Sequence, residues 1–316
     1  MKICILGSGG VFGTNLAAYL LAQGHTVMGI GRSPKKPECF SLGVDYPYHA
    51  YHITYEWEYA RREILLFNPD AIVNFAAQGE GAASFGWDNW RYYETNCVGL
   101  VRLVSDLDYR FVHIGSSEVY GSVNKPVGES APLCPSSPYS ISKAAFDQHL
   151  VAMNRVKGFP MNIIRPSNCL AEGQQLHRIV PKAAICALTG RELVLHGGGV
   201  AMKSYLHADD LSKAILTVIQ KGSIGDIYNC GPDEPVSIRH IVELVAAACA
   251  VPFDSFVQVG PERMGQDGQY WLSSEKIKLL GWKQQIPLAD GIKRVVDWVK
   301  KYPELFGMDT NFKMRA

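Results

Sequence analysis

A glycine-rich turn close to the first residue restricts the fold of this chain more than any other feature of its sequence. Residues 2–6 form a short apolar strand pattern, the turn GSGGVFG follows over residues 7–13, and residues 14–22 have a helical pattern. Glycines allow a tight turn and a close approach of the backbone to a ligand, so that a pyrophosphate can lie at the N-terminus of the helix. Strand, turn and helix in this order predict a dinucleotide-binding fold. The turn residues that we expect beside the cofactor are Gly7, Gly10, Val11, Phe12 and Gly13.

The second predicted strand bears on which dinucleotide is bound. It covers residues 26–30 and is followed by Gly31-Arg32-Ser33. A site specific for NAD usually carries an acidic side chain here, which hydrogen-bonds the ribose 2′-hydroxyl. This turn has no acidic residue, and the guanidinium of Arg32 can pair with a 2′-phosphate through two hydrogen bonds. The sequence therefore favours NADP(H), with NAD(H) as the alternative in which Arg32 only faces solvent.

A further strand pattern, over residues 70–75, ends in the small side chains of Ala76-Ala77-Gln78. Small residues at the carboxyl end of a parallel strand leave room for a flat cofactor in the crevice of the sheet. A helix over residues 90–105 and a strand over residues 111–114 follow. This alternation of strands and helices predicts a doubly wound parallel sheet.

The pair Tyr139 and Lys143 is the best candidate for acid–base chemistry. Both lie on a predicted helix over residues 139–153, where positions four apart share one side. A fixed cation nearby lowers the pKa of a phenol, and such a tyrosine can remove a proton from an alcohol or sugar hydroxyl. The alternative for the pair alone is a solvated helix face.

Composition argues against several classes of function. The 316-residue chain has a formal net charge of +1, which does not favour binding to nucleic acid or to an anionic membrane surface. Its eight cysteines are scattered, without a CxxC pair or a histidine–cysteine cluster, so we expect reduced thiols and no metal site. No run approaches the roughly 18 apolar residues of a membrane span, and the first residues lack the pattern of a signal peptide. The sequence predicts a cytoplasmic protein without membrane or nucleic-acid partners.

Several motifs together make a more specific case. GSGGVFG, NFAAQ, SSEVYG, SPYSISKAAFD and RPSN, with a late segment over residues 265–282, lie in order along nearly the whole chain. On these residues the chain resembles the extended short-chain dehydrogenase/reductase family, and in particular its nucleotide-sugar epimerases and dehydratases. The resemblance implies a catalytic triad of Ser116, Tyr139 and Lys143. It also implies that Asn96, behind the triad, orders the lysine through water.

The stretch Ser116-Ser117-Glu118 separates subclasses of this family. By the same resemblance, sugar 4,6-dehydratases carry a glutamate at the position of Glu118, whereas 4-epimerases tend to have small, non-acidic residues there. A carboxylate at this place can take the C5 hydrogen that a 4-keto group makes acidic. UDP-glucuronate decarboxylases also resemble the Ser-Glu pattern, so the stretch leaves more than one reaction open.

The second half of the chain supplies candidate contacts to the substrate. In the family an asparagine at the position of Asn168 contacts the substrate diphosphate, although Leu170-Ala171-Glu172 here replaces the usual Tyr-Gly-Pro after it. Lys203 stands where relatives often have arginine, and Gln269 replaces an arginine in a loop over residues 265–270 that resembles a nucleotide clamp. The other residues that the resemblance places beside substrate or cofactor are Ser117 and Pro166.

Two more stretches complete the predicted site. Arg178 and Lys182 begin a predicted helix, where they can reach phosphates or simply face solvent. Gly197-Gly198-Gly199 predicts the turn of a hairpin.

Together these patterns predict an α/β protein with a Rossmann-type doubly wound parallel sheet and a smaller C-terminal α/β substrate-binding domain. We expect the dinucleotide-binding domain over residues 1–165, which also receives segments from about residues 205–247. The substrate-binding domain is expected over residues 166–204 and 248–316.

The predicted function is the modification of a nucleotide-diphosphate sugar through transient oxidation at C4. An NDP-hexose 4,6-dehydratase is the first prediction and a 4-epimerase the alternative, followed by an NDP-uronate decarboxylase or a 4-ketosugar reductase. A non-catalytic dinucleotide sensor and a reductase of apolar carbonyls are the alternatives outside this class. The resemblance also implies a homodimer, with a four-helix bundle of the helices near residues 90–105 and 138–153 at its interface.

Overall fold

A parallel sheet forms the centre of the molecule in the computed structural model, which describes residues 1–34, 36–79, 84–262 and 268–312. Among these residues, seven strands pair in the order β11-β6-β5-β4-β1-β2-β3, and every neighbouring pair is parallel. The strands are β1 (Lys2–Leu6), β2 (Thr26–Gly31), β3 (Tyr48–Ala50), β4 (Ala71–Asn74), β5 (Arg110–Ile114), β6 (Met161–Pro166) and β11 (Ile227–Cys230). The order reverses between β1 and β4, where ligands of such sheets bind. The predicted doubly wound sheet is confirmed.

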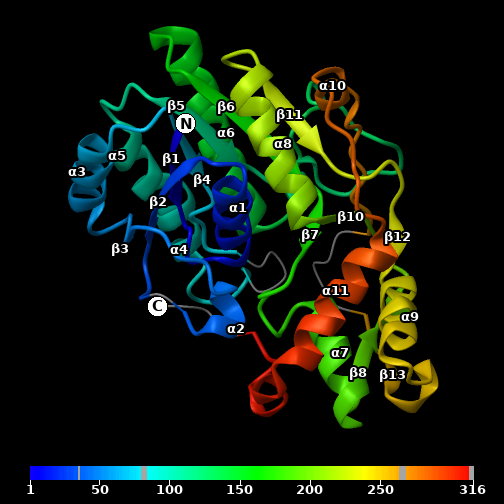
Figure 1. Cartoon of the computed structure of the whole chain (residues 1–316). Coiled ribbons are helices and arrows are strands. Elements are labelled where there is room, and N and C mark those ends of the chain that lie inside the picture. The colour runs from blue at the N-terminus through cyan, green and yellow to red at the C-terminus, as the bar shows by residue number, and fades with distance from the viewer. Residues whose placement is uncertain (35, 80–83, 263–267, 313–316) are drawn as a thin grey trace.

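Helices cover both faces of the sheet because side chains alternate along each strand. In β1, Ile3 and Ile5 pack with one set of helices, α1 and α8, while Cys4 and Leu6 pack with α3, α5 and α6 on the opposite face. Figure 1 shows these two layers of helices around the strands. The helices are α1 (Val11–Ala22), α3 (Trp57–Phe67), α5 (Leu100–Val104), α6 (Pro138–Lys157) and α8 (Ala208–Lys221). A short helix, α2 (Glu38–Ser41), packs through Cys39 with residues of the C-terminal part of the chain.

Helix α6 has strong local signals at both ends. Ser137 caps it by accepting a hydrogen bond from the amide of Ser140, and the Ser140 hydroxyl accepts one from the Ser137 amide. Pro138 occupies the first turn, and Gly158 ends the helix in the left-handed conformation. Tyr139 therefore lies in the first turn of a long, rigid helix.

The helix predicted over residues 90–105 is interrupted in its middle. It consists of α4 (Trp90–Tyr93), a π-helical turn η1 (Glu94–Gly99) and α5, and it contains the buried Asn96. Single π turns inside helices often occur at functional sites. Gly99 is needed here, because a Cβ atom would lie 2.9 Å from the Thr54 Cα.

The C-terminal part builds a second core from helices and short strands. Its elements lie together in Figure 1, at the opposite side of the molecule from α3 and α5. They are α7 (Ile179–Thr189), β8 (Leu193–His196), α9 (Ile238–Cys249), β13 (Val257–Gly260) and α11 (Leu288–Lys301). The remaining elements are η2 (Ser117–Tyr120), β7 (Asn168–Leu170), η3 (Gly197–Gly199), β9 (Met202–Lys203), β10 (Tyr205–His207), β12 (Val236–Ser237), η4 (Phe253–Ser255), α10 (Glu275–Leu279) and η5 (Pro303–Gly307).

The glycines of η3 do not form the predicted hairpin, so that prediction was wrong. Strand β8 before them pairs in parallel with β13, and strand β9 after them pairs antiparallel with β12. Gly199 has a φ of +74°, and a Cβ atom on it would lie 2.7 Å from the Arg239 amide nitrogen. These glycines therefore permit a close approach to α9 rather than a reversal between two paired strands.

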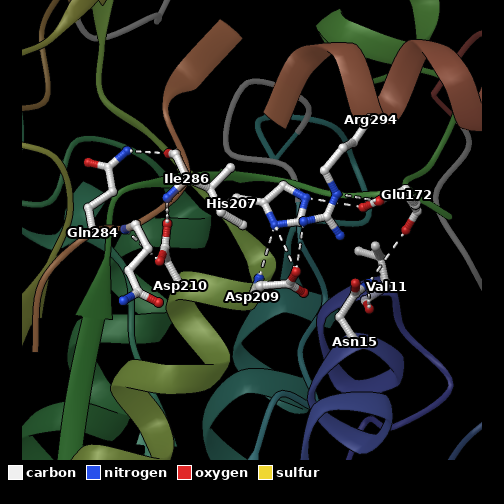
Figure 2. Close-up of polar contacts among 10 residues, drawn as sticks. Val11, Asn15, Glu172, His207, Asp209, Asp210, Gln284, Ile286 and Arg294 are labelled. Carbon is white, nitrogen blue, oxygen red and sulfur yellow. Dashed lines mark hydrogen bonds and ion pairs between the residues drawn. The ribbon is translucent and has the colours of Figure 1, made fainter. Parts of the chain in front are cut away.

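A group of charged side chains, which we call the junction cluster (Glu172, His207, Asp209 and Arg294), joins the two cores. His207 Nε2 lies 3.1 Å from Glu172 Oε2, and Arg294 of α11 donates to both Glu172 and Asp209 at 2.8 Å. Asn15 of α1 donates to the Glu172 carbonyl. Figure 2 shows these side chains meeting between α1, α8 and α11. The cluster links the helix after the glycine turn to the C-terminal core.

No helix among the described residues has both the length and the apolar character needed to cross a bilayer. The predicted clamp loop over residues 265–270 lies partly outside the described residues, because positions 265–267 are not among them.

Candidate active site

A cavity of about 620 Å³ opens at the carboxyl edge of the sheet, where the strand order reverses. It extends from the glycine turn after β1 to strand β8 of the C-terminal core. Most of the side chains singled out in the sequence line it. They are Gly7, Gly10, Val11, Phe12, Gly13, Arg32, Ala76, Ala77, Gln78, Ser116, Ser117, Glu118, Tyr139, Lys143, Pro166, Asn168, Arg178, Lys182 and Lys203.

The glycine turn is packed so closely that side chains do not fit at two of its positions. Gly7 has a φ of +76°, and a Cβ atom on it would lie 2.6 Å from the Ala76 amide nitrogen. A Cβ atom on Gly13 would lie 2.6 Å from the Gly7 carbonyl oxygen. The turn therefore brings backbone amides and the N-terminus of the 12-residue helix α1 to the cavity, as phosphate binding requires.

The outer end of the cavity follows β2 and includes residues that the sequence reasoning missed. Tyr48 donates from its hydroxyl to the Ser33 carbonyl at 2.6 Å, and a Cβ atom on Gly31 would lie 2.6 Å from this hydroxyl. Lys36 and His52 also line the cavity beside Arg32. No motif marks these residues; they come from the edge strand β3 and the loops around it. This end of the cavity combines cationic groups with an aromatic wall.

Asn96 does not line the cavity, but it forms hydrogen bonds with the segments that do. Its Oδ1 accepts from the Gln78 amide at 2.7 Å, and its Nδ2 donates to the Gln78 carbonyl and to Ser142 Oγ. Ser142 in turn donates to the Tyr139 carbonyl at 2.6 Å. The π turn of η1 thus ties the loop after β4 to the first turn of α6.

Ser116, Glu118, Tyr139 and Lys143 converge on the inner part of the cavity. Ser116 Oγ accepts from the Glu118 amide at 3.2 Å and thereby caps the 3₁₀ turn η2. The Tyr139 amide donates to Ser84, and its ring packs edge-on against Tyr92, with ring centroids 6.2 Å apart. A hydroxyl, a carboxylate, a phenol and an amine therefore share one wall.

Lys143 is almost fully buried, with 2% of its surface exposed. Its Nζ donates to the Ile114 carbonyl at 2.7 Å and lies 3.3 Å from His113 Nε2. Burial lowers the pKa of Lys143 to about 8, although the charge of Asp147 opposes the change. An amine with such a pKa exchanges protons readily near neutral pH.

The part of the cavity lined by the C-terminal core carries cations and one departure from the prediction. Lys203 is buried, and its Nζ lies 3.5 Å from the centroid of the Tyr270 ring. Gln269 does not line the main cavity; it borders a separate hollow with Ser122 and Lys125. The described residues contain no group of three or more histidine, cysteine or acidic side chains placed to hold a metal ion.

Comparison with known proteins bears directly on this site. The model of the NAD dependent epimerase/dehydratase family matches residues 3–231. The chain belongs to this family. The match includes the glycine turn, the Ser-Glu stretch and the Tyr-Lys pair, and it ends just after β11. The resemblance stated from the sequence is thereby confirmed.

The relatives found by sequence are sugar-nucleotide enzymes. A trifunctional UDP-glucose 4,6-dehydratase/UDP-4-keto-6-deoxy-D-glucose 3,5-epimerase/UDP-4-keto-L-rhamnose-reductase of Arabidopsis thaliana is 31% identical over 252 residues, 76% of this chain and 37% of the relative. The chain thus spans little more than a third of that protein. The dTDP-D-glucose 4,6-dehydratase of Homo sapiens is 31% identical over 242 residues, 73% of this chain and 69% of the relative.

A solved structure agrees over nearly the full length. DesIV, a dTDP-glucose 4,6-dehydratase from Streptomyces venezuelae solved with NAD and TYD bound, superposes with a TM-score of 0.89. The two sequences are 28% identical, and the match covers 97% of this chain and 99% of DesIV. The fold, including the C-terminal core, is therefore that of an extended short-chain dehydrogenase/reductase.

Proposed function

We propose that this chain is a nicotinamide-dependent 4,6-dehydratase of a nucleotide-diphosphate hexose. The observation that carries the proposal is the presence of Glu118 in the same cavity as Tyr139 and Lys143. Tyr139 and Lys143 suit the removal of a hydroxyl proton, whereas Glu118 suits a second proton transfer at carbon. The names of the relatives at 31% identity support the same reaction.

The residues around the glycine turn fit a dinucleotide. Close packing at Gly7 and Gly13 keeps the backbone open to a pyrophosphate, and Ala76 and Ala77 leave space for a flat ring. When bound, a nicotinamide dinucleotide supplies an acceptor for a hydride from C4 and a donor of that hydride to C6. We propose NADP(H), because Arg32 and Lys36 line the ribose end of the cavity; the NAD bound to DesIV supports NAD(H) as the alternative.

Tyr139 removes the proton of the C4 hydroxyl in this proposal. The ammonium form of Lys143 stabilises the tyrosinate, and Ser116 donates to the C4 oxygen as its charge changes. Asn96 acts behind them by holding the Gln78 backbone and, through Ser142, the start of α6. These groups together convert a C4 alcohol into a ketone.

Glu118 then acts at C5. The C4 ketone makes the C5 hydrogen acidic; the carboxylate takes that proton and passes it to the departing C6 hydroxyl, so that water leaves. Hydride then adds at C6 and a proton from solvent adds at C5. The glutamate is half-buried beside Ser117, and both line the cavity. An epimerase has no need of this second base.

We assign the diphosphate of the substrate to the polar groups of the far wall. Asn168, Arg178, Lys182 and Lys203 line this part of the cavity and supply an amide and three cations. In this proposal residues 1–165 bind the dinucleotide, and residues 166–204 and 238–316 bind the nucleotide half of the substrate. Helix α9 was expected with the dinucleotide-binding domain, but its apolar face packs in the C-terminal core. Gln269 borders a different hollow, so we do not count on it for the diphosphate.

A 4-epimerase is the second candidate, since the family model covers both activities. The test is incubation of the purified protein with glucose and uronic acid linked to dTDP, UDP and GDP in heavy water, followed by mass spectrometry and NMR. Loss of water with deuterium at C5 supports the dehydratase. An isomer of unchanged mass supports the epimerase, and loss of carbon dioxide supports a decarboxylase. No turnover of any sugar contradicts the proposal.

The variant Glu118→Gln separates the two proton transfers. We expect water loss to fall by about two to three orders of magnitude, because the amide cannot accept the C5 proton. Reduction of the bound dinucleotide, seen by its absorbance, should persist because Tyr139 and Lys143 remain. Glu243→Gln, at an exposed position of α9 that does not line the cavity, is the control.

We also propose that the chain forms a homodimer through the α4–α5 segment and α6. Large exposed apolar side chains support this interface. They are Phe85, Trp87, Trp90, Val98 and Ile141, with Trp87 100% exposed. Sedimentation at micromolar concentration tests it, and a monomer alone would contradict it.

A further inference from the structure

A buried row of polar side chains lies directly behind Lys143. We call Asn74, His113, Lys143 and Asp147, with Arg165, the lysine cluster. Asn74, His113 and Asp147 are fully buried. His113 Nδ1 lies 2.9 Å from Asn74 Nδ2, and its Nε2 lies 3.3 Å from Lys143 Nζ and 3.6 Å from Asp147 Oδ1. His113 Nε2 is therefore close to both the lysine amine and the carboxylate.

Hydrogen bonding fixes where the imidazole proton lies. The Ala76 amide donates to Asn74 Oδ1 at 3.1 Å, which leaves the Asn74 amide nitrogen to face His113. That nitrogen only donates, so Nδ1 of His113 accepts. Burial, with the charges of Lys143 and Arg165, lowers the pKa of His113 well below its usual value, so the ring is neutral. The single ring proton is therefore on Nε2.

The Nε2 proton of His113 has two neighbours, a carboxylate that accepts hydrogen bonds and an ammonium that only donates them. Asp147 Oδ2 accepts from Arg165 at 2.8 Å, whereas Asp147 Oδ1 has no hydrogen-bond partner within the described part of the chain. An ammonium on Lys143 presents only donors, so it gains nothing from the Nε2–H 3.3 Å away. The ring proton suits the free carboxylate oxygen, and the nitrogen that carries it lies 3.6 Å from that oxygen and 3.3 Å from the amine.

Without the His113 ring proton, Lys143 and Asp147 would be expected to form an ion pair. They lie four residues apart on α6, on the same side of the helix, and both are buried. In a medium of low polarity such a pair would hold the ammonium firmly against the carboxylate. The amine would then be turned away from the first turn of α6, where Tyr139 lies.

We propose that His113 is a positioning residue for Lys143: its Nε2–H screens Asp147 and leaves the amine available to Tyr139. The proposal deepens the proposed function, because it rests on the roles given there to Tyr139 and Lys143. His113 does not touch the substrate; it acts through the lysine.

The titratable and charged groups around Lys143, among the residues that the structure describes, come from several elements, and Glu118 of η2 shares the cavity. His113 comes from β5, Arg165 from β6, and Tyr139 and Asp147 from α6 itself. Tyr120 of η2 accepts from Arg165 at 2.7 Å and so helps to hold the guanidinium beside Asp147. The Arg165 guanidinium thus holds one carboxylate oxygen and His113 screens the other.

Two amide variants of His113 test the proposal, because their side chains differ only in length, by one methylene group. His113→Asn reaches about as far as the ring Nδ1, so it keeps a partner for Asn74 but leaves Asp147 open to Lys143. His113→Gln reaches about as far as Nε2 and keeps a donor between them. His149 stacks on the Phe146 ring, which His113 meets edge-on, and gives the control His149→Asn.

The readout is the ionisation of Tyr139 in the protein with NAD(H) or NADP(H) bound, measured by ultraviolet difference titration against Tyr139→Phe versions of each variant. In His113→Asn we expect the tyrosinate midpoint to rise by about one pH unit, because the lysine charge is drawn to Asp147. With substrate, kcat at neutral pH should fall by about tenfold with KM unchanged. His113→Gln and His149→Asn should stay close to the wild type.

Equal midpoints in the Asn and Gln variants, or a wild-type midpoint in His113→Asn, would overturn the proposal. If the Asn variant does not fold, ¹⁵N NMR of the labelled wild-type histidines decides instead: a proton on Nδ1 of His113 contradicts the screening role. The titration needs no sugar substrate. A shifted midpoint in a protein that turns over no sugar therefore refutes the proposed function while leaving the role of His113 intact.

Discussion

The junction cluster and the lysine cluster contain similar groups, but the carboxylate is fully hydrogen-bonded in the first and only partly hydrogen-bonded in the second. In each, a buried histidine directs Nε2 at a carboxylate beside an arginine. In the junction cluster His207 lies 3.1 Å from Glu172, and Arg294 donates to the second oxygen of the same carboxylate. In the lysine cluster the corresponding distance is 3.6 Å, and a carboxylate oxygen of Asp147 has no partner among the described residues.

The pKa shifts of Glu172 and Lys143 reflect this difference, because one favours the charged form of its group and the other favours the neutral form. At Glu172, burial favours the neutral acid, but the hydrogen bond from His207, a backbone amide and the charge of Arg294 outweigh it and lower the pKa to about 2. At Lys143, burial dominates and lowers the pKa to about 8. A fully paired cluster stabilises its charge and the fold, whereas an incompletely paired one brings a pKa close to neutrality at a cost in stability.

Replacing the central lysine should have the largest effect. We expect Lys143→Met to lower kcat by about three orders of magnitude, because tyrosinate loses its nearby cation. Its thermal midpoint should be unchanged or higher, since an apolar side chain of similar size no longer buries a charge. Activity assays and thermal unfolding check this. If Lys143→Met kept its activity and had a lower thermal midpoint, Lys143 would serve stability rather than catalysis, contrary to this prediction.

Replacing the central carboxylate of the junction cluster should do the opposite. Glu172→Gln is expected to reduce the free energy of unfolding by about 2 kcal/mol, because His207 and Arg294 lose their charged acceptor. Its kcat should stay within about threefold of the wild type. Denaturant unfolding measures the loss. The matched control is Glu243→Gln in the exposed pair with Arg239, which should change stability by about 0.5 kcal/mol or less.

The two clusters should also respond to pH in separate windows. The folded pKa of Glu172 lies below its unfolded value of about 4.3, so its contribution is present above that pH and is lost as pH falls through about 2. The folded pKa of Lys143 lies below its usual 10.5, so burial of this lysine costs stability at neutral pH, and the cost disappears as pH rises from about 8 toward 10.5.

Unfolding of the wild type against each variant checks these windows. The stability advantage of the wild type over Glu172→Gln should shrink in acid. The stability of the wild type relative to Lys143→Met should improve in alkali. A constant difference across pH in either pair would show that the group does not titrate as described.

The smallest expected effect is that of Arg294→Lys. A lysine keeps the charge but lacks the planar fork whose Nε and Nη1 each reach one carboxylate, so we expect a loss of about 0.5 to 1 kcal/mol. Arg294 is 40% exposed, which limits the loss. Thermal unfolding of this variant beside Glu172→Gln measures it. A loss as large as that of Glu172→Gln would mean that the arginine, not the carboxylate, organises the junction.

The sequence predicted the first βαβ unit and helix α6 because their signals are local. A glycine turn between a strand and a helix, and a proline after a capping serine, need no tertiary information. His113 could not be found this way, since all residues of β5 after Arg110 are buried and no alternation marks a functional face. Its partners come from β4, α6 and β6, which only the assembled sheet brings together.

The errors and omissions have a similar origin. Gly197-Gly198-Gly199 resembles a hairpin turn locally, but the pairing of β8 with β13 is decided by a strand some sixty residues later in the chain. Glu172 replaces a residue of a familiar motif, and its role became visible only beside His207 and Arg294. Distant pairings and charge clusters thus account for what local patterns missed.

The fate of the hydrogen at C4 tests the central claim most directly. A nucleotide-diphosphate glucose deuterated at C4 is converted by the purified protein, and the product is analysed by NMR. We expect a 4-keto-6-deoxy sugar that carries the deuterium at C6. Deuterium retained at C4 of an isomer, or lost to solvent without appearing at C6, would contradict it.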